Sequence, residues 1–310
     1  MLDGETNKSF SGIEFKKITL SDKAIFEPYL AASANISCEL SFGNLFAWSG
    51  VEDIRWALFE GALLIRNKDG FYFPLAPEGG AAAAERALRM IAEAGEPLVS
   101  LTAGQAGEAA ALAPGYIFAN DRDRSEYVYD AAALREYPGK GLHAKRNHLN
   151  RFIALYGERS SFEPIGRKNI EECRQFGREW AKVNSYYLAG TLAADLGITE
   201  IFLDNFEALG LVGLCARVDG SVKGYTVGER AYPGSDAVVV HVEKASYDVE
   251  GIYPALAAMF LRANPGFARV NREDDLGDEG LRRSKLSYKP EFLLEKFTGR
   301  KARGMRTGDS

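Results

Sequence analysis

Three strand-like runs follow one another directly in the C-terminal half of the chain, at residues 211–218, 222–229 and 237–244. Asp219-Gly220 separates the first two runs, and this dipeptide readily adopts the positive φ angles of a tight hairpin turn. Tyr232-Pro233-Gly234 separates the second and third runs and also favours a turn. Strands with such short connections pair as antiparallel neighbours, so the sequence predicts a three-stranded meander.

The elements expected around this meander follow a known order. A strand at 159–165 and helices at 169–183 and 191–209 precede it, and a helix at 252–262, a strand at 268–271, a helix at 279–286 and a strand at 292–297 follow it. The order βααβββαβαβ matches the GNAT fold, in which a crossover helix connects the meander to a parallel strand through a right-handed βαβ unit.

The N-terminal half supports nearly the same order. Strands are expected at 13–20, 54–59, 62–66, 71–75, 97–101 and 126–129, and helices at 22–32, 44–48, 81–94 and 105–112. The fold class is therefore expected to be α/β (α+β), with two GNAT-like domains of the acyl-CoA N-acyltransferase type in tandem and mixed sheets flanked by helices. We expect the domains to be residues 1–137 and 138–310, because turn-forming residues cluster at 137–141. A single irregular α/β domain is the alternative.

Composition narrows the class of protein. The 310 residues are 46% hydrophobic and 26% charged, which is ordinary for a globular protein. We expect a cytoplasmic location, because no apolar run of about 18 residues and no signal-peptide pattern is present. Cys38, Cys173 and Cys215 lack metal-ligand spacing, so we expect reduced thiols and no metal. The net charge of −5 argues against a general nucleic-acid-binding surface.

The candidate catalytic residues are His241, Glu243 and Tyr288. In a GNAT-type sheet the fourth and fifth strands separate and the donor lies between them, which points to the strand at 237–244. Because side chains two residues apart share a face of a strand, His241 and Glu243 are expected to point together into this cleft. Either could take a proton from an attacking amine, and Tyr288 could protonate a leaving group. A structural pair at a sheet edge would leave the same pattern.

A charged segment after the strand at 268–271 supplies candidate substrate-binding residues. Asn271, Glu273 and Asp275 lie where open α/β sheets usually bind ligands, and the carboxylates could hold a substrate ammonium. Arg282 and Lys285 follow in the next expected helix, where they could pair with the phosphates of coenzyme A or with the terminal adenosine of tRNA. A solvated loop beside a basic helix face would have the same composition.

A second basic stretch, at residues 143–152, is expected to form a helix. Lys145, His148 and Arg151 would lie toward one side of it, with Arg146 beside them. These four residues are candidates for binding a phosphate or the backbone of tRNA. The alternative is a solvated helix face.

Three segments carry a family resemblance: SCELSFGNL at 37–45, HAKRNHLNRF at 143–152 and NREDDLGDEGLRRSKLSYKP at 271–290. They resemble the phosphatidylglycerol lysyltransferase C-terminal-like family, and the resemblance covers most of the chain. That family is similar to the peptidoglycan-bridge aminoacyltransferases and has tandem GNAT-like domains. Its best-known members move an amino acid from aminoacyl-tRNA onto a lipid headgroup. By this resemblance Lys285 and Arg282 would lie by the donor and Asp275 by the ligand pocket.

The sequence departs from acetyltransferases in the segment after the meander. The usual (Gln/Arg)-x-x-Gly-x-(Gly/Ala) loop is replaced by YDVEGIY at 247–253. Asp248 and Glu250 in this segment would repel the pyrophosphate of coenzyme A, which such a loop normally cradles with its N–H groups. Acetyl-CoA is therefore a poorly suited donor.

Together these features predict a soluble acyl- or aminoacyltransferase-like enzyme that uses aminoacyl-tRNA or acyl-CoA as a co-substrate and has no covalently bound cofactor. The acceptor would be an amine or a hydroxyl. A non-catalytic protein of the same fold that binds a small molecule or nucleotide is the alternative, and a partner-binding module of a larger assembly is a third class. The sequence contains no Walker loop, GxGxxG, HExxH or GxSxG motif, which removes the common kinase, dehydrogenase, metalloprotease and serine-hydrolase classes.

Overall fold

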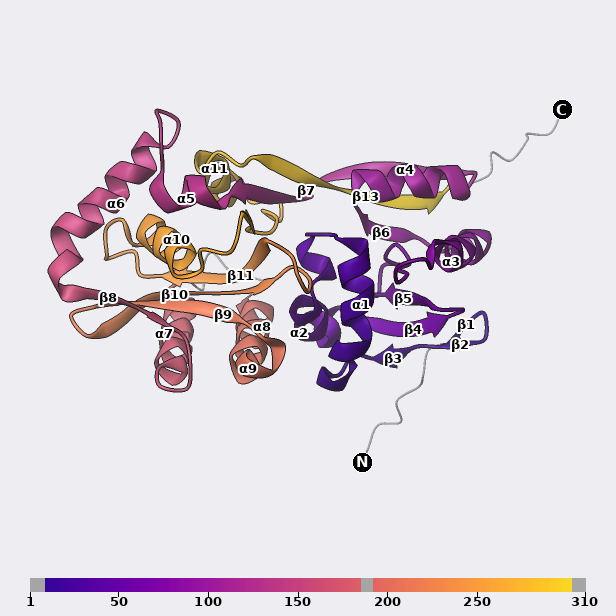
Figure 1. The fold of residues 1–310 in the computed structure, drawn as a ribbon, viewed down its shortest axis with the longest axis horizontal. Coiled ribbons are helices and arrows are strands. Elements are labelled where there is room, and N and C mark those ends of the chain that lie inside the picture. The colour runs from indigo at the N-terminus through magenta and orange to yellow at the C-terminus, as the bar shows by residue number, and fades with distance from the viewer. Residues whose placement is uncertain (1–8, 185–191, 303–310) are drawn as a thin grey trace. The chain divides into compact units, whose positions relative to one another are not determined.

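The computed structural model describes residues 9–184 and 192–302 (Figure 1). The chain divides into two compact units, and neither is one continuous stretch. Unit 1 comprises Met1–Ala34, Trp48–Ser125 and Leu294–Ser310, and unit 2 comprises Asn35–Ala47 and Glu126–Leu293. The boundary expected at residue 137 therefore lies inside unit 2, and a short piece of the N-terminal sequence also belongs to unit 2.

Unit 2 is a mixed sheet with helices on both faces. Its strand order is β8-β9-β10-β11-β12-β7. The strands are β8 (Ser160–Pro164), β9 (Val212–Val218), β10 (Ser221–Arg230), β11 (Ala237–Ala245), β12 (Arg269–Asn271) and the end of β7 (Tyr116–Asp130), which begins in unit 1. The helices are α5 (Ala131–Glu136), α6 (His143–Tyr156), α7 (Ile170–Val183), α8 (Leu192–Asp204), α9 (Phe206–Leu209), α10 (Ile252–Ala263) and α11 (Glu279–Ser287). Figure 1 shows α10 on one face of this sheet and α7, α8 and α9 on the other.

The pairing of the strands confirms the predicted meander and the strand order around it. β9 pairs antiparallel with β10, β10 pairs antiparallel with β11, and β11 pairs parallel with β12. In the turn between β9 and β10, Asp219 and Gly220 have φ angles of 52° and 78°, as a two-residue hairpin turn requires. Thr191, where the second expected helix begins, lies outside the described residues.

β11 leaves its parallel partner after the third of its nine residues. The last Cα partners of β11 and β12 are Val239 and Asn271, so β11 continues beyond the pair. On its other side the register with β10 passes from Val240↔Gly228 to Val242↔Val227, so His241 is an extra residue without a Cα partner. Such a β-bulge bends a strand and re-aims its side chains. β11 therefore changes direction at the point where it separates from β12.

The main core of unit 2 lies between the sheet and α10. Val238 and Val240 of β11 and Leu214 and Ala216 of β9 point toward this helix and are buried. Four tyrosines close the same core where β7, α5 and α11 meet: Tyr127, Tyr129, Tyr137 and Tyr288.

Unit 1 contains the elements expected for the N-terminal half, with shorter strands at its start. The elements are β1 (Ser9–Phe10), β2 (Ile13–Glu14), β3 (Lys16–Lys17), α1 (Lys23–Ser33), the end of α2 (Phe42–Glu52), β4 (Arg55–Phe59), β5 (Ala62–Arg66), α3 (Ala81–Glu93), β6 (Leu98–Leu101), α4 (Ala103–Leu112), the start of β7 and most of β13 (Phe292–Lys301). β3, β4 and β5 form one sheet, and β6 pairs with β13. The expected strand at 71–75 forms only isolated bridges. Within the described ranges, no helix combines the length and apolar character needed to cross a bilayer.

Candidate functional site

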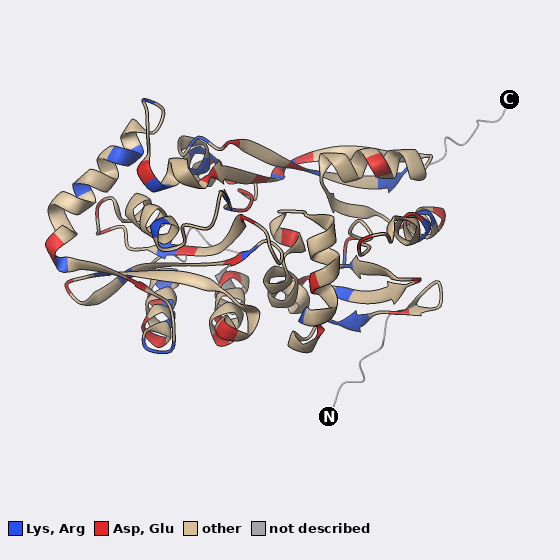
Figure 2. Cartoon of the chain, viewed as in Figure 1, with Lys and Arg blue, Asp and Glu red and all other residues tan. Residues whose placement is uncertain are grey.

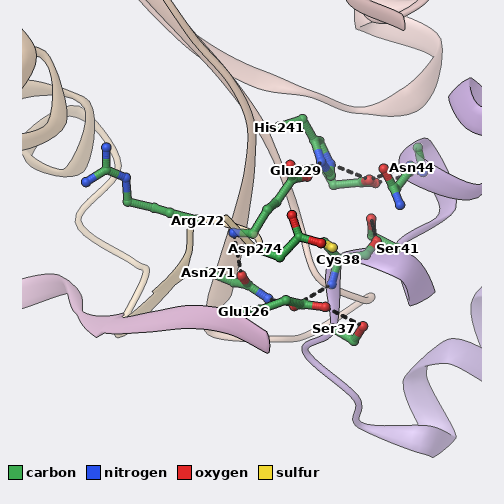
Figure 3. Close-up of polar contacts among 12 residues, drawn as sticks. Ser37, Cys38, Ser41, Asn44, Glu126, Glu229, His241, Asn271, Arg272 and Asp274 are labelled. Atoms are coloured by element: carbon green, nitrogen blue, oxygen red, sulfur yellow. Dashed lines mark hydrogen bonds and ion pairs between the residues drawn. The ribbon is translucent and has the colours of Figure 1, made fainter. Parts of the chain in front are cut away.

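Two buried glutamates attach the segment Asn35–Ala47 to the sheet of unit 2 (Figure 3). The first is Glu229 of β10, which accepts hydrogen bonds from the main-chain N–H groups of Gly43 at 3.0 Å and Asn44 at 3.1 Å. These groups lie in the first turn of α2, where the helix dipole favours a negative charge. A Cβ on Gly43 would lie only 2.6 Å from Glu229 Oε1, so a side chain at this position would displace the carboxylate.

The second glutamate, Glu126 of β7, has the same role a few residues earlier in the segment. It accepts from Ser37 Oγ at 2.9 Å and from the N–H of Cys38 at 3.0 Å, and Asn271 Nδ2 donates to it as well. Glu126, Ser37 and Asn271 are at most 1% exposed. These bonds form away from water, where an unpaired partner costs about 1–3 kcal/mol or more if it is charged. The segment is therefore held firmly beside β12.

His241, the bulged residue of β11, lies between two carboxylates. Its Nε2 is 2.9 Å from Glu229 and its Nδ1 is 2.8 Å from Glu273, while its ring stacks on Phe202 of α8 with 4.7 Å between centroids. Burial would lower the pKa of His241, but the hydrogen bonds to Glu229 and Glu273 outweigh burial and raise the pKa to about 9. At neutral pH the ring is an imidazolium, and both ring nitrogens donate. Both ring nitrogens are therefore occupied, and His241 joins β10 to the loop after β12.

This arrangement makes stability depend on pH in a defined direction. The folded-state pKa of about 9 lies above the ordinary value of 6.5, so the stabilisation is complete below pH 6.5 and is lost as pH rises through 9. It amounts to about 3 kcal/mol at most. We expect urea unfolding to show His241→Gln losing less stability than the wild type between pH 6.5 and 9.5, and the exposed His148→Gln behaving as the wild type. An unchanged pH profile in His241→Gln would contradict the charged state assigned here.

The structure corrects the expectation that His241 and Glu243 point together into one cleft. His241 contacts α8 on one face of the sheet, whereas Glu243 forms an ion pair with Arg272 Nη2 at 2.6 Å. Arg272 in turn lies over the ring of Tyr288, in the core on the α10 face. Figure 3 shows Arg272 extending away from His241 and Glu229. The cause is the bulge, because an extra residue at position 241 shifts the alternation of all side chains after it.

The predicted substrate-binding residues Asp275 and Arg282 do meet, but as partners of each other. Arg282 binds the Asp275 carboxylate through Nε at 2.8 Å and Nη2 at 2.7 Å, and Tyr127 Oη and the N–H of Gly277 donate to it as well. Asp275 is fully buried. Burial would raise the pKa of Asp275, but the hydrogen bonds from Arg282 and Tyr127 hold it well below its usual range. The cluster fixes the loop after β12.

Asn271 and Glu273 stabilise the start of the same loop. Asn271 Oδ1 accepts the N–H of Glu273 at 2.8 Å, and Asn271 Nδ2 donates to the main-chain oxygen of Ile36 at 2.8 Å. Glu273 has a φ of 58°, a conformation that non-glycine residues seldom adopt. These contacts bring the Glu273 carboxylate to His241.

Lys285 lies in α11 and Tyr288 directly follows this helix. Both residues are buried. Lys285 Nζ donates to the main-chain oxygens of Arg272, at 2.6 Å, and Asp274, and burial lowers its pKa. Tyr288 packs edge-on against Tyr129, and burial raises its pKa to about 12. Lys285 thus supports the loop from within.

The four basic candidates on α6 diverge in the structure, and Figure 2 shows Lys and Arg spaced along this helix. Arg146 donates to the main-chain oxygens of Tyr137 and Gly139, and the exposed Arg151 pairs with Glu250. His148 is exposed. Lys145 alone turns inward, with its Nζ 3.7 Å from the ring centroid of Tyr288.

The first turn of α10 offers few donors for an anion. The N–H of Ile252 is bonded to the oxygen of Val249 at 3.3 Å, and Pro254 has no N–H. Gly251, with a φ of 78°, lies against α6 so closely that a Cβ would be 2.1 Å from the main-chain oxygen of His148. Carboxylates flank this turn on Asp248 and Glu250.

Sequence reasoning missed Glu126, Glu229 and Arg272 as site residues. Glu229 is the next-to-last residue of β10, Arg272 directly follows β12, and Glu126 precedes the buried apolar run of β7; a charged residue beside an apolar run was the available signal. Their partners lie up to 186 positions away in sequence, so only the fold reveals the contacts. In the described part of the chain, no group of His, Cys, Asp and Glu is arranged to hold a metal ion.

The mixed sheet, the split between β11 and β12 and the flanking helices define an acyltransferase-like α/β domain. The chain belongs to the family described as phosphatidylglycerol lysyltransferase, C-terminal, whose match covers residues 31–299.

Solved structures share this fold. A conserved protein of unknown function from Bacteroides thetaiotaomicron has 30% sequence identity and a TM-score of 0.85, and the match covers 93% of this chain and 99% of that one. The C-terminal domain of a putative lysylphosphatidylglycerol synthetase from Agrobacterium fabrum has 12% identity and a TM-score of 0.62, over 92% of this chain and 93% of that one. L-PGS from Bacillus licheniformis has 14% identity and a TM-score of 0.55, over 82% and 86%. At these identities the last two show the fold alone.

A curated relative matches over part of its length. An uncharacterized protein of Mycoplasmoides gallisepticum is 25% identical over 177 residues, which are 56% of this chain and 55% of that protein. The match therefore spans about half of each protein.

Proposed function

We propose that the chain transfers an aminoacyl group from an activated ester to an amine or hydroxyl acceptor, at the edge of β11 beyond its pairing with β12. One observation carries this proposal. The imidazole of His241 is 1% exposed, while the residue as a whole is partly exposed, so the exposed atoms at the bulge belong to the main chain. β11 has separated from β12 at this point, so its exposed main-chain groups can contact the carbonyl group of a bound donor.

In this transfer the acceptor attacks the carbonyl carbon of the donor ester, the carbonyl oxygen gains negative charge, and the donor alcohol leaves with a proton. Glu243 is the better of the two proposed bases, because both nitrogens of His241 are occupied. Among the described residues, Arg272 is the one hydrogen-bond partner of the Glu243 carboxylate, and the Glu243 side chain is 13% exposed. A second carboxylate oxygen can therefore accept the proton of the acceptor.

The first turn of α10 favours an aminoacyl donor over acyl-CoA. A coenzyme A pyrophosphate needs several free N–H groups at a helix N-terminus. Here Ile252 is already bonded, Pro254 has no N–H, and Asp248 and Glu250 add negative charge beside the turn. The description of the family, phosphatidylglycerol lysyltransferase, names the transfer of a lysyl group and so supports an aminoacyl donor.

The test is an assay of the purified chain with tRNA charged with radiolabelled amino acids, one amino acid at a time, and with amine, glycerol and glycerophosphate acceptors. Labelled product should form, and Glu243→Gln should lower kcat by about 10²–10⁴. Glu163→Gln, which alters a half-exposed glutamate of β8, is the matched control.

A thermal-shift titration separates binding from transfer. A non-hydrolysable aminoacyl-adenosine analogue should raise Tm, and coenzyme A should not. A raised Tm without any product would favour the non-catalytic binding protein, and stabilisation by coenzyme A would overturn the choice of donor.

A further inference from the structure

Two buried polar atoms beside Glu243 have no hydrogen-bond partner among residues 9–184 and 192–302. One is the hydroxyl oxygen Oγ1 of Thr226, in β10, and the other is Nη1 of Arg272, which directly follows β12. Thr226 as a whole is 1% exposed. Buried polar groups without a partner are rare in folded proteins, and such groups commonly hold an ordered water or a ligand.

Thr226 lies directly opposite Glu243 in the sheet. The two residues are Cα partners in the antiparallel pair of β10 and β11. Side chains of directly opposed residues lie on the same face, with their Cβ atoms about 4.5–5.5 Å apart. On its other side Thr226 is the partner of Leu214 of β9, which belongs to the core against α10. Thr226 and Glu243 are therefore neighbours on the α10 face of the sheet.

Arg272 brings its unpaired nitrogen to the same carboxylate. Its Nη2 donates to Glu243 Oε1 at 2.6 Å, and Nη1 is joined to Nη2 through a single carbon atom. A molecule that forms two hydrogen bonds of about 2.8 Å connects polar groups up to about 5.6 Å apart. The hydroxyl of Thr226, the carboxylate of Glu243 and Nη1 of Arg272 lie within this span of one another.

We propose that these three groups hold one water molecule, and that this water is a second acceptor, so that the chain also hydrolyses aminoacyl esters. Water matches the groups in number and in kind, because a buried water typically forms about three hydrogen bonds. It accepts from Arg272 Nη1 and donates to Glu243, and the Thr226 hydroxyl can be its donor or its acceptor. An ammonium group does not match, because it cannot accept a hydrogen bond from Nη1.

The hydrolysis uses the same base and the same ester as the transfer, so this inference rests on the proposed function. Glu243 takes a proton from the water while the water oxygen attacks the carbonyl carbon of the ester. The bond from this carbon to the donor alcohol then breaks, and Glu243 returns the proton to the alcohol. The products are the free amino acid and the free alcohol. An amine or hydroxyl acceptor must displace the water to reach Glu243, so transfer and hydrolysis compete.

The first experiment follows both reactions at once. tRNA charged with a radiolabelled amino acid is incubated with the purified chain, without an acceptor and with each acceptor in turn, and the free amino acid and the transfer product are counted separately. Free amino acid should form faster than without the protein, and more slowly when an acceptor is used. Transfer product without protein-dependent release of free amino acid would overturn the hydrolysis alone. Release without transfer product would overturn the proposed function alone, and the absence of both would overturn both.

Variants of Thr226 test where the water binds. Thr226→Val keeps the shape of the side chain and removes the hydroxyl, so the rate of hydrolysis should fall about three- to tenfold. Thr226→Ser keeps the hydroxyl and should hydrolyse at close to the wild-type rate. Thr298→Val, which alters a half-buried threonine of β13, is the matched control. Equal rates in the wild type and Thr226→Val would overturn the site.

A second measurement does not depend on activity. If the Thr226 hydroxyl holds a water, Thr226→Val removes a hydrogen bond and should lower Tm. If the hydroxyl is buried without any partner, valine removes the cost of burying it and should raise Tm. An unchanged or higher Tm in Thr226→Val would contradict the bound water.

Discussion

Glu229→Ala is expected to reduce the free energy of unfolding by about 4 kcal/mol, because it removes the acceptor of two buried main-chain N–H groups and one of two partners of a buried imidazolium. Urea unfolding followed by circular dichroism measures the change. Glu229→Gln keeps the shape and one acceptor oxygen, so its loss should be smaller.

The matched control is Glu207→Ala. Glu207 forms a two-point contact with Arg167, but both side chains are largely exposed, at 62% and 86%. Exposed pairs contribute little to stability, because water screens their charges. If Glu207→Ala and Glu229→Ala cost the same, the buried network around Glu229 does not stabilise the segment Asn35–Ala47 as described.

Asp275→Ala is expected to destabilise the protein by about 3–5 kcal/mol. The substitution leaves Arg282 and the hydroxyl of Tyr127 without their common buried partner. Asp275→Asn should lose less, since it can still accept hydrogen bonds. Calorimetric unfolding of the variants measures these losses, and Asp204→Ala, at a 62% exposed side chain bound to Arg174, is the control.

Lowering the pH should reproduce part of the loss of stability that is expected for Asp275→Ala. The folded-state pKa of Asp275 lies below its ordinary value of 3.8, so its contribution is present above that pH and is lost as pH falls below it. Asp275→Asn should therefore lose less stability than the wild type between pH 5 and 3. Parallel losses in the two proteins would place the stabilisation elsewhere.

The elements of unit 2 could be predicted from the sequence because their signals are local. Asp219-Gly220 marks its hairpin through two positive φ angles, and the apolar spacing of 170–183 and 252–263 marks α7 and α10. The parallel pairing of β11 with β12 followed from the crossover helix between them. These features depend on residues close together in the chain.

The side-chain arrangement could not be predicted in the same way. The extra residue at His241 places Glu243 on the face of the sheet opposite to His241. No pattern in the sequence of the strand predicts this bulge. The roles of Asp275 and Lys285 depended on partners from β7 and from the loop after β12. Both looked like exposed binding groups in the sequence, and both are buried and occupied.

The interleaved composition of the two units has a consequence for synthesis on the ribosome. Unit 2 needs residues 35–47 and also residues up to 293, and unit 1 needs β13, which ends at residue 301. Unit 2 cannot be completed before residue 293 has emerged, nor unit 1 before residue 301, although multidomain proteins usually fold their N-terminal domain first. Gly43 and Asn44 of the early segment can form their hydrogen bonds only after Glu229 has been made, 186 and 185 positions later. A nascent chain cut short after residue 125 would lack both glutamates that hold this segment, and would be a substrate for chaperones and proteases rather than a finished domain.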